Sequence, residues 1–286
     1  MLAPRVVILG ATGFVAGALT RLLEAEARPC RPVPAREVDL TAASAVSVLS
    51  AILKPSDAVV VCSALTPEHG RDRAAFLKNV AMIDHLCAAL AAGPVAHVVY
   101  ISSDAVYAGH DEIITEEAYC ETADLYGLAH IVREKMLQAA CTSLAIPCAV
   151  LRPGAIYGAQ DTHNAYGPNR FVRTALAAGR IALFGEGEEQ RDHIYVRDVA
   201  RIIQLSVHQR SAGVLNAVTG VSLTFCEIAD TIAGAVGGNV IIENVPRAVP
   251  VVHRHFDAAA LRTAFPEFHP MPFDAAIRET IATLRP

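Results

Sequence analysis

Lysine is scarce in this chain of 286 residues, where it occurs only as Lys54, Lys78 and Lys135, so arginine carries most of the positive charge. The formal net charge is −5, and the charges are scattered without a basic stripe, which argues against a nucleic-acid partner. No apolar run reaches the length of a membrane-spanning helix, and the first strand pattern begins at residue 5, too early for a signal peptide to precede it. We therefore expect a cytoplasmic protein without a membrane partner.

Paired cysteines and metal-binding patterns are also missing. The seven cysteines are an odd number, contain no C-x-x-C, and several lie in apolar patterns. Reduced core thiols fit this usage better than disulfides, and neither zinc nor another metal is expected. Hydrophobic residues make up 53% of the chain, which is enough for a large core, so the length predicts one α/β domain or one with a small appended lobe.

The most informative segment is residues 5–16, Arg-Val-Val-Ile-Leu-Gly-Ala-Thr-Gly-Phe-Val-Ala. Its β-branched run is typical of a strand buried on both faces, and it leads into Gly10, Gly13 and Ala16 at the spacing G-x-x-G-x-x-A. Gly10 allows a tight turn, Gly13 lets the backbone approach a pyrophosphate, and Ala16 lets a helix pack on the strand. Free N–H groups at that helix N-terminus favour phosphates, so the segment predicts a dinucleotide site. An ordinary strand–helix turn is the alternative.

Strand and helix patterns alternate through the first two-thirds of the chain. After the first strand we predict strands near residues 31–34, 57–62, 95–102 and 147–152, and helices near residues 13–25, 41–53, 71–92 and 122–143. Repeated units of this kind predict a doubly wound parallel sheet with helices on both faces, whose ligands bind at the carboxyl ends of the strands. The dinucleotide-binding Rossmann domain would span residues 1–157.

Beyond residue 157 the pattern changes to polar, glycine-rich loops and short helices. Loops are expected at residues 158–169 and 185–193 with a helix between them, and further helices near residues 196–207, 224–236, 258–264 and 272–284. We interpret residues 158–286 as a smaller α/β lobe that binds the substrate and is partly interleaved with the sheet.

Two hydroxyls, Ser102 and Ser103, end the strand predicted at 95–102, and Tyr126 and His130 share one face of the helix predicted at 122–143. Beside a nicotinamide, a tyrosine hydroxyl can exchange a proton with a substrate carbonyl or alcohol while a serine holds that oxygen. A nearby cation would lower the tyrosine pKa and hold the nicotinamide ribose. In the plainer interpretation the serines merely end a strand and the tyrosine lies on a helix surface.

Together these segments resemble the extended short-chain dehydrogenase/reductases, in particular the NAD-dependent epimerase/dehydratase family and its dTDP-4-dehydrorhamnose reductase-like branch. The resemblance rests on the glycine turn, Ser-Ser-Asp-Ala-Val-Tyr at 102–107, Tyr-Gly-Leu-Ala-His at 126–130 and Arg-Pro-Gly-Ala-Ile-Tyr-Gly at 152–158. It continues through Gln-Arg-Asp-His-Ile-Tyr-Val-Arg-Asp at 190–198 and covers essentially the whole chain. It implies a Rossmann fold, a nicotinamide nucleotide and a substrate such as a nucleotide-linked sugar.

Residue by residue, the resemblance implies a cofactor site and a substrate site. Ser103 and Tyr126 would be the catalytic hydroxyls, with Asn79 as a structural or relay residue. Cofactor contacts would come from Gly10, Thr12, Gly13, Phe14, Val15, Asp39, Leu40, Ser63, Ala64, Tyr126 and His130. Substrate contacts would come from Asp104, Asn169, Arg170 and Arg191. Of these, Arg191 would pair with a diphosphate through its forked guanidinium. A solvated loop charge or a structural ion pair is the alternative for both arginines.

The chain departs from the family's Tyr-x-x-x-Lys pattern at His130, which would take the place of lysine in the catalytic group. Lysine is a permanent cation at neutral pH, whereas histidine, with an ordinary pKa of about 6.5, is mostly neutral and supports tyrosine ionisation less. Lys135 lies on the opposite side of the helix, and Arg133 shares the tyrosine face two turns away. Three consequences stay open: an altered pH dependence, a reaction that asks little of the tyrosine, or a lost activity with the fold retained.

The remaining predictions concern cofactor, reaction and assembly. Asp104-Ala105 stands where dehydratases of the group carry an Asp-Glu pair, which argues against sugar dehydration. The second strand ends without an acid for the ribose 2′-hydroxyl, and Arg31 and Arg36 would accept a 2′-phosphate, so NADP is favoured over NAD. We expect an NAD(P)-dependent oxidoreductase or epimerase, with keto-sugar reduction ahead of epimerisation, in a homodimer paired through the helices at 71–92 and 122–143. The alternative is a non-catalytic, cofactor-binding sensor or scaffold.

Overall fold

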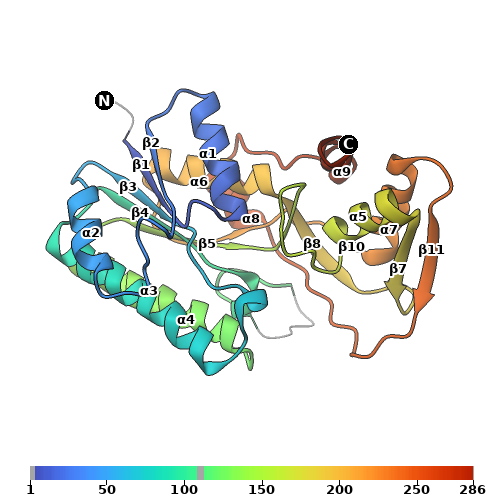
Figure 1. Ribbon diagram of the computed structural model, residues 1–286, viewed down its shortest axis with the longest axis horizontal. Coiled ribbons are helices and arrows are strands. Elements are labelled where there is room, and N and C mark those ends of the chain that lie inside the picture. The colour runs from blue at the N-terminus through green and yellow to red at the C-terminus, as the bar shows by residue number, and fades with distance from the viewer. Residues whose placement is uncertain (1–3, 108–112, 286) are drawn as a thin grey trace. The chain divides into compact units, whose positions relative to one another are not determined.

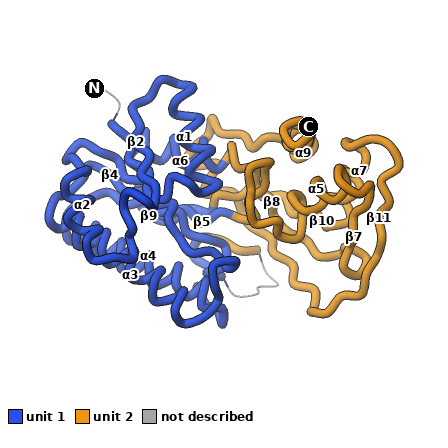
Figure 2. The backbone as a smooth tube through the Cα atoms, in the orientation of Figure 1, with its two compact units in different colours: residues 1–108, 116–153, 199–216 blue, residues 109–115, 154–198, 217–286 orange. Residues whose placement is uncertain are grey.

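The computed structural model describes residues 4–107 and 113–285, and its helices and strands are shown in Figure 1. The chain folds as two compact units, drawn in different colours in Figure 2. Unit 1 comprises residues 1–108, 116–153 and 199–216, and unit 2 comprises residues 109–115, 154–198 and 217–286. Neither unit is a continuous stretch of sequence, because the chain returns to unit 1 after residue 198.

Unit 1 is built on a six-stranded sheet in the order β2-β1-β3-β4-β5-β9, parallel from β2 to β5. Its strands are β1 (Val6–Leu9), β2 (Cys30–Val33), β3 (Ala58–Val61), β4 (His97–Ile101), β5 (Cys148–Pro153) and β9 (Gly213–Ala217). Every residue of β1, β3 and β4 is buried, because helices cover both faces of the sheet. The doubly wound parallel sheet predicted from the alternating pattern is confirmed.

The helices of unit 1 form a layer on each face of this sheet. α1 (Phe14–Ala25) and most of α6 (Val196–Gln209) lie on one face, where the Gln204 amide of α6 bonds to Glu26 at the end of α1. α2 (Ala45–Ile52), α3 (Arg73–Ala92) and α4 (Leu125–Ser143) lie on the other, and α3 packs along α4 (Figure 1). Two short 3-10 helices, η1 (Pro67–His69) and η2 (Asp104–Val106), follow β3 and β4.

The predicted start of α2 was wrong by four residues. The helix was expected from residue 41, but it begins at Ala45. The reason is local, since the Asp39 carboxylate accepts hydrogen bonds from both the backbone N–H and the hydroxyl of Thr41. Such side-chain bonds to neighbouring backbone compete with a helix and favour a turn.

α3 corrects the expectation that no apolar run reaches transmembrane length. Among the described residues it is the one helix long and apolar enough to cross a membrane, with a mean hydropathy of 1.3, although only 33% of that window is buried. The helix carries Lys78 and Asp84, and its buried residues Ile83, Leu86 and Leu90 belong to the core of unit 1. Core helices of water-soluble proteins share this composition.

Unit 2 contains two small sheets, β10-β8-β6 and the parallel pair β11-β7. Its strands are β6 (Ala155–Tyr157), β7 (Arg180–Phe184), β8 (Gln190–Tyr195), β10 (Ser222–Thr224) and β11 (Ile241–Val245). Its helices are α5 (Pro168–Ala178), α7 (Phe225–Val236), α8 (Ala259–Ala264) and α9 (Phe273–Leu284).

The start of β8 lies in a segment that was predicted as loop because it is polar. The buried Asp192 explains the difference: its carboxylate accepts hydrogen bonds from the backbone N–H groups of Thr219 and Gly220 and from the Thr219 hydroxyl. A buried carboxylate with this many partners is satisfied, so a polar sequence can form an interior strand.

Candidate active site

The turn after β1 brings three strand ends together. Gly10 has a φ of +80°, and a Cβ built on it would lie 2.8 Å from the backbone N and Cα of Ser63, which follows β3. The N–H groups of Gly10 and Ala11 both donate to the Val33 carbonyl at the end of β2. Because β2 and β3 lie on opposite sides of β1, this turn is the point at which the strand order reverses, where parallel sheets bind ligands. Only glycine fits at position 10.

The helix that follows has no N-cap side chain to bond its first backbone donors. α1 begins at Phe14, and its N-cap Gly13 supplies no side-chain hydrogen bond. Thr12 is exposed, and Val15 is partly buried. Unpaired N–H groups and the positive end of the helix dipole together suit a phosphate group.

The predicted cofactor residues that follow β2 and β3 differ in how far they are buried. Ser63 and Ala64 follow β3, and the Ser63 hydroxyl is buried without a hydrogen-bond partner in the described part of the chain. Leu40 is buried, whereas Asp39 is exposed and its pKa is lowered by the hydrogen bonds from Thr41.

Arg31 and Arg36, both predicted as 2′-phosphate ligands, differ in their partners. Arg31 is paired with Glu37. Arg36 is exposed after the end of β2, and none of the described residues pairs with it. Arg36 is therefore the arginine whose charge is left for a ligand.

Ser103 and Tyr126, the predicted catalytic hydroxyls, lie together. Ser103 caps η2 by accepting a hydrogen bond from the Ala105 N–H at 3.1 Å, and it lies near enough to Tyr126 to lower the pKa of the tyrosine hydroxyl. Tyr126 stands in the first turn of α4 and is followed by Gly127, where a Cβ would lie only 2.2 Å from the Ala105 carbonyl oxygen. The absence of a side chain at Gly127 lets η2 rest on α4, which brings Ser103 near Tyr126. Sequence reasoning missed this glycine.

The surroundings of Tyr126 keep its hydroxyl protonated. Burial raises its pKa to about 12, against the lowering effects of the nearby Ser103 hydroxyl and the positive charge of Arg133. Asp104 and Glu68 raise the pKa further through their negative charges. At neutral pH the tyrosine is therefore a proton donor.

His130 is neutral and contributes no charge to this site. It is 2% exposed, its Nδ1 lies 2.7 Å from the Tyr100 hydroxyl, and its ring packs edge-on against Tyr126 with centroids 4.7 Å apart. Burial, and then the nearby charge of Arg133, lower its pKa to about 3. Its Nε2 is buried with no partner among the described residues, so this nitrogen can bond only to a group that enters the site.

A buried ion pair lies behind the serine that precedes Ser103. The Arg152 guanidinium binds both carboxylate oxygens of Glu134, and the Ser102 hydroxyl donates to the same carboxylate at 2.5 Å. Arg152 also donates to the Tyr107 hydroxyl, which donates to Asn216 at 2.8 Å. Sequence reasoning singled out the segment that contains Arg152 but missed its partner Glu134.

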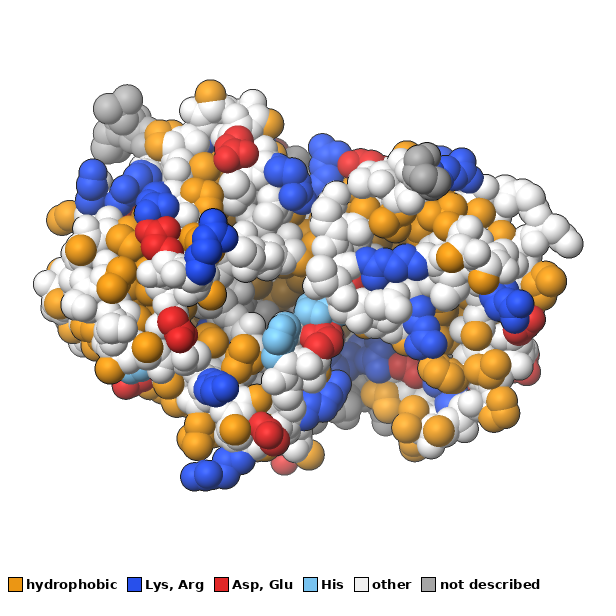
Figure 3. Space-filling view, viewed as in Figure 1, with side chains coloured by type: hydrophobic (Ala, Val, Ile, Leu, Met, Phe, Trp, Pro, Cys, Tyr) orange, Lys and Arg blue, Asp and Glu red, His pale blue; other side chains and the backbone are white. Residues whose placement is uncertain are grey.

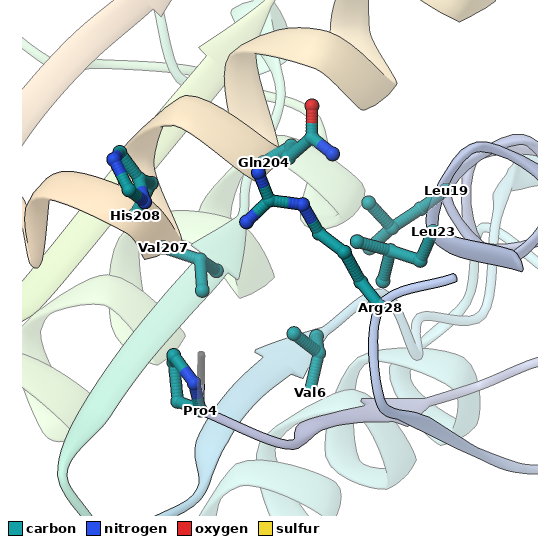
Figure 4. Close-up of a pocket in the computed structure, with 8 residues that line it drawn as sticks. All are labelled: Pro4, Val6, Leu19, Leu23, Arg28, Gln204, Val207 and His208. Atoms are coloured by element: carbon teal, nitrogen blue, oxygen red, sulfur yellow. The ribbon is translucent and has the colours of Figure 1, made fainter. Parts of the chain in front are cut away.

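Two pockets of unit 1 differ in position. One lies where the amino ends of α3 and α4 meet, between Leu65, Phe76, Asn79 and Tyr126. The other, shown in Figure 4, is lined by Val6 of β1, Leu23 of α1 and Gln204 of α6, among others. Val6 is the first residue of β1, so this second pocket lies at the amino end of the strand, away from the glycine turn.

The predicted substrate residues other than Asp104 belong to unit 2. Asn169 is buried, and its amide accepts from the Gly158 N–H and donates to Asp161, so it holds the loop before α5. Arg170 is exposed. Asp104, in unit 1, is the first residue of η2, and the Ser103 hydroxyl donates to it at 3.4 Å.

Arg191 lies in a cluster of side chains in which positive and negative charges alternate. Its guanidinium donates twice to Glu189 Oε1, and Arg247 donates to Glu189 Oε2 at 2.9 Å. Arg247 also reaches Glu188 and the Phe184 carbonyl. One carboxylate thus bridges two arginines that a phosphate could bind, and sequence reasoning found neither Glu189 nor Arg247.

Metal ligands do not gather anywhere in the residues that the structure describes, since no group of three or more His, Cys, Asp or Glu side chains is placed to hold an ion. On the face of the molecule shown in Figure 3, basic side chains are interspersed with apolar and acidic ones.

The chain belongs to the NAD dependent epimerase/dehydratase family, whose model matches residues 6–218. Solved structures share its fold over nearly the whole chain. A UDP-N-acetylglucosamine 4-epimerase from Methanobrevibacter ruminantium M1, in complex with UDP-N-acetylmuramic acid, is 21% identical with a TM-score of 0.86, covering 99% of this chain and 98% of its own. A UDP-glucose 4-epimerase from Thermus thermophilus, in complex with NAD, is 20% identical with a TM-score of 0.84, covering 98% of each. A GDP-L-fucose synthetase from Naegleria fowleri, bound to NADP, is 18% identical with a TM-score of 0.84, covering 99% and 94%.

Proposed function

We propose that this chain is an NAD(P)-dependent enzyme that acts on a carbonyl or alcohol carbon of a nucleotide-linked sugar, in the manner of a dTDP-4-dehydrorhamnose reductase. The Ser103–Tyr126 pair, on the unit that carries the glycine turn, is the observation that supports this most strongly. Membership of the NAD dependent epimerase/dehydratase family supports the same chemistry, and proteins of this fold have been solved with NAD, NADP and UDP-linked sugars.

The described residues fit a nicotinamide nucleotide, which when bound would supply or accept a hydride. Gly10 lets the turn pack on the backbone of Ser63, and Gly13 precedes a helix whose N-terminus suits a pyrophosphate. The Ser63 hydroxyl and His130 Nε2 are buried polar atoms without partners among the described residues, as expected where ribose hydroxyls bind.

The state of Tyr126 favours reduction of a keto-sugar. Its hydroxyl is protonated at neutral pH and lies near Ser103, so it can donate to a carbonyl oxygen that Ser103 also holds. Epimerisation commonly needs a second acid or base, and we assign no residue to that role. We extend the proposal to a cytoplasmic homodimer paired through α3 and α4, where Leu77 and Leu128 are exposed.

The first test is a binding titration with NAD⁺, NADH, NADP⁺ and NADPH at pH 6 and pH 8. We expect NADPH to bind more tightly than NADH, and Arg36→Ala to remove on the order of tenfold in affinity for NADP(H) alone, because it deletes a phosphate ligand. Arg31→Ala is the matched control, since Glu37 already pairs with that arginine. His130 stays neutral at pH 6 and at pH 8, so it should cause no difference between the affinities measured at the two pH values. Failure of all four nucleotides to bind would sink the proposal.

The second test uses a nucleoside diphosphate such as UDP or dTDP. Arg191→Ala should weaken binding by about tenfold, because one forked phosphate ligand is lost. Glu189→Gln should strengthen it by a similar factor, since the carboxylate that neutralises Arg191 and Arg247 is removed. Arg180→Ala, an exposed arginine of the same unit, is the control. Equal affinities in all variants would show that these arginines bind no diphosphate.

A further inference from the structure

Arg133 is a fully buried cation on the helix that carries Tyr126. Its exposed fraction is 0%, and it lies one turn of α4 beyond His130. One Nη donates to the Asn79 side-chain oxygen at 2.8 Å, and the other donates to the Ser63 carbonyl. Both of these acceptors are neutral oxygens.

The charge of Arg133 is not neutralised by an acidic side chain in the described part of the chain. Arg152, the other arginine that is buried among the described residues of this unit, contrasts with it because Glu134 binds two of its three nitrogens, Nε and Nη2, in a close pair. Burying a charge without a counter-ion is costly, so an unneutralised buried cation is commonly found where a site uses it.

Aromatic rings connect this cation to the predicted catalytic group. The guanidinium carbon lies 5.2 Å from the centroid of the Tyr100 ring, a distance typical of a cation–π contact. The Tyr100 hydroxyl bonds to His130 Nδ1, and the His130 ring packs against Tyr126. The positive charge also opposes the rise in the Tyr126 pKa.

We propose that Arg133 supplies the permanent positive charge of this site, while His130 supplies only a hydrogen bond. The two tasks that one lysine performs in a Tyr-x-x-x-Lys motif are thus divided between residues on successive turns of α4. This inference rests on the proposed function, because it assigns the charge to a site that binds a nicotinamide nucleotide. Arg133 acts through its neighbours and is a positioning residue.

A purely structural role is the competing explanation. Arg133 and Asn79 together hold the segment after β3, since Asn79 also bonds to both the N–H and the carbonyl of Leu65. Loss of that support would weaken the binding of any cofactor. It would not distinguish one oxidation state from another.

The test compares the dissociation constants of the oxidised and reduced cofactor. The nicotinamide ring is positively charged only when oxidised, so a fixed cation nearby disfavours that form. Arg133→Met should therefore shift the ratio of the two constants toward the oxidised form by on the order of tenfold, as expected for a unit charge within about 10 Å. Arg133→Lys keeps the charge and should keep the ratio, even where both affinities fall. Lys135→Met removes an exposed charge from the same helix and should leave the ratio unchanged.

The double variant H130K/R133M moves the charge back one turn and should restore the wild-type ratio. H130K alone places two cations side by side, so we expect it to be less stable than the double variant. If Arg133→Met does not fold, Arg133→Gln takes its place, because glutamine retains a hydrogen-bond donor without the charge. The ratio of its dissociation constants for the oxidised and reduced cofactor then tests the inference. An equal loss of affinity for both oxidation states, with no rescue by H130K/R133M, would overturn the inference. Absence of binding by the wild-type protein would instead refute the proposed function.

Discussion

Replacing Gly127 with alanine is expected to destabilise unit 1 and to part Ser103 from Tyr126, although alanine is the better helix former. The added Cβ would lie 2.2 Å from the Ala105 carbonyl oxygen and 2.8 Å from Cγ2 of Thr122. The carbonyl is backbone, so it can withdraw only if η2 moves away from α4. Helix propensity favours alanine by about 1 kcal/mol, and overpacking against backbone typically costs about 1–3 kcal/mol or more. We expect a net loss on the order of 1–2 kcal/mol.

Two other helical glycines provide matched controls for this prediction. A Cβ at Gly17 of α1 would meet only the end of the flexible Arg21 side chain, at 3.4 Å, and one at Gly234 of α7 would meet nothing within 4 Å. Gly17→Ala and Gly234→Ala should therefore raise the free energy of unfolding by up to about 1 kcal/mol. Urea unfolding of the three variants measures the difference. A Gly127→Ala variant as stable as these two would contradict the close approach of η2 to α4.

The sequence predicted the architecture of unit 1 because strong local signals agree with one another there. The buried runs of β1, β3 and β4 are rich in valine and isoleucine, and α1 and α3 between them are 12 and 20 residues long. The choice of Ser103 and Tyr126 came from the resemblance to the family, since the residues alone also allowed a strand-end serine and a helix-surface tyrosine. The glycine turn carries a backbone requirement that is visible in the residue type itself, as the φ of Gly10 shows.

The strands of unit 2 were not predicted individually because their polar residues are satisfied by distant partners. Asp192 of β8 bonds to Thr219, 27 residues away in sequence. The charge pattern around Arg191 likewise depends on Arg247, which meets Glu189 across 58 residues. Local periodicity gives no information about such distant partners, so a buried polar strand is predicted as a loop.

The same limit explains why the burial of His130 and Arg133 could not be predicted. Helical spacing puts Arg133 on the face of Tyr126 but does not give its depth, which depends on Asn79, 54 residues earlier. Nor does spacing show that His130 is buried deeply enough for its pKa to fall to about 3. Burial is a property of the packed chain, which the spacing of residues along one helix does not give.

Breaking the Arg152–Glu134 pair is expected to have the largest effect on stability. The two side chains are 5% and 2% exposed, and their closest contact is 2.6 Å. Glu134→Gln preserves the shape of the side chain but leaves Arg152 buried without a counter-charge. Removing one partner of a buried pair typically costs about 3–5 kcal/mol, so this single change should remove much of the stability of unit 1. Asp274→Asn, which breaks the exposed pair with Arg278, is the control and should change the free energy of unfolding by about 0.5 kcal/mol or less.

The double variant Glu134→Leu/Arg152→Met separates the effect of this ion pair on the stability of unit 1 from its effect on the position of Ser103. Replacing both charges with apolar groups of similar volume is often close to neutral, so most of the loss should be recovered in urea unfolding. The Ser102 hydroxyl, however, loses the carboxylate that it binds at 2.5 Å, and Ser103 is the next residue. We therefore expect a stable protein in which Ser103 is displaced from Tyr126 and lowers its pKa less, seen as a change in the Tyr126 titration relative to a Tyr126→Phe reference. A double variant as unstable as Glu134→Gln would mean that the network serves the fold through its hydrogen bonds to Ser102 and Tyr107, more than through the pairing of its charges.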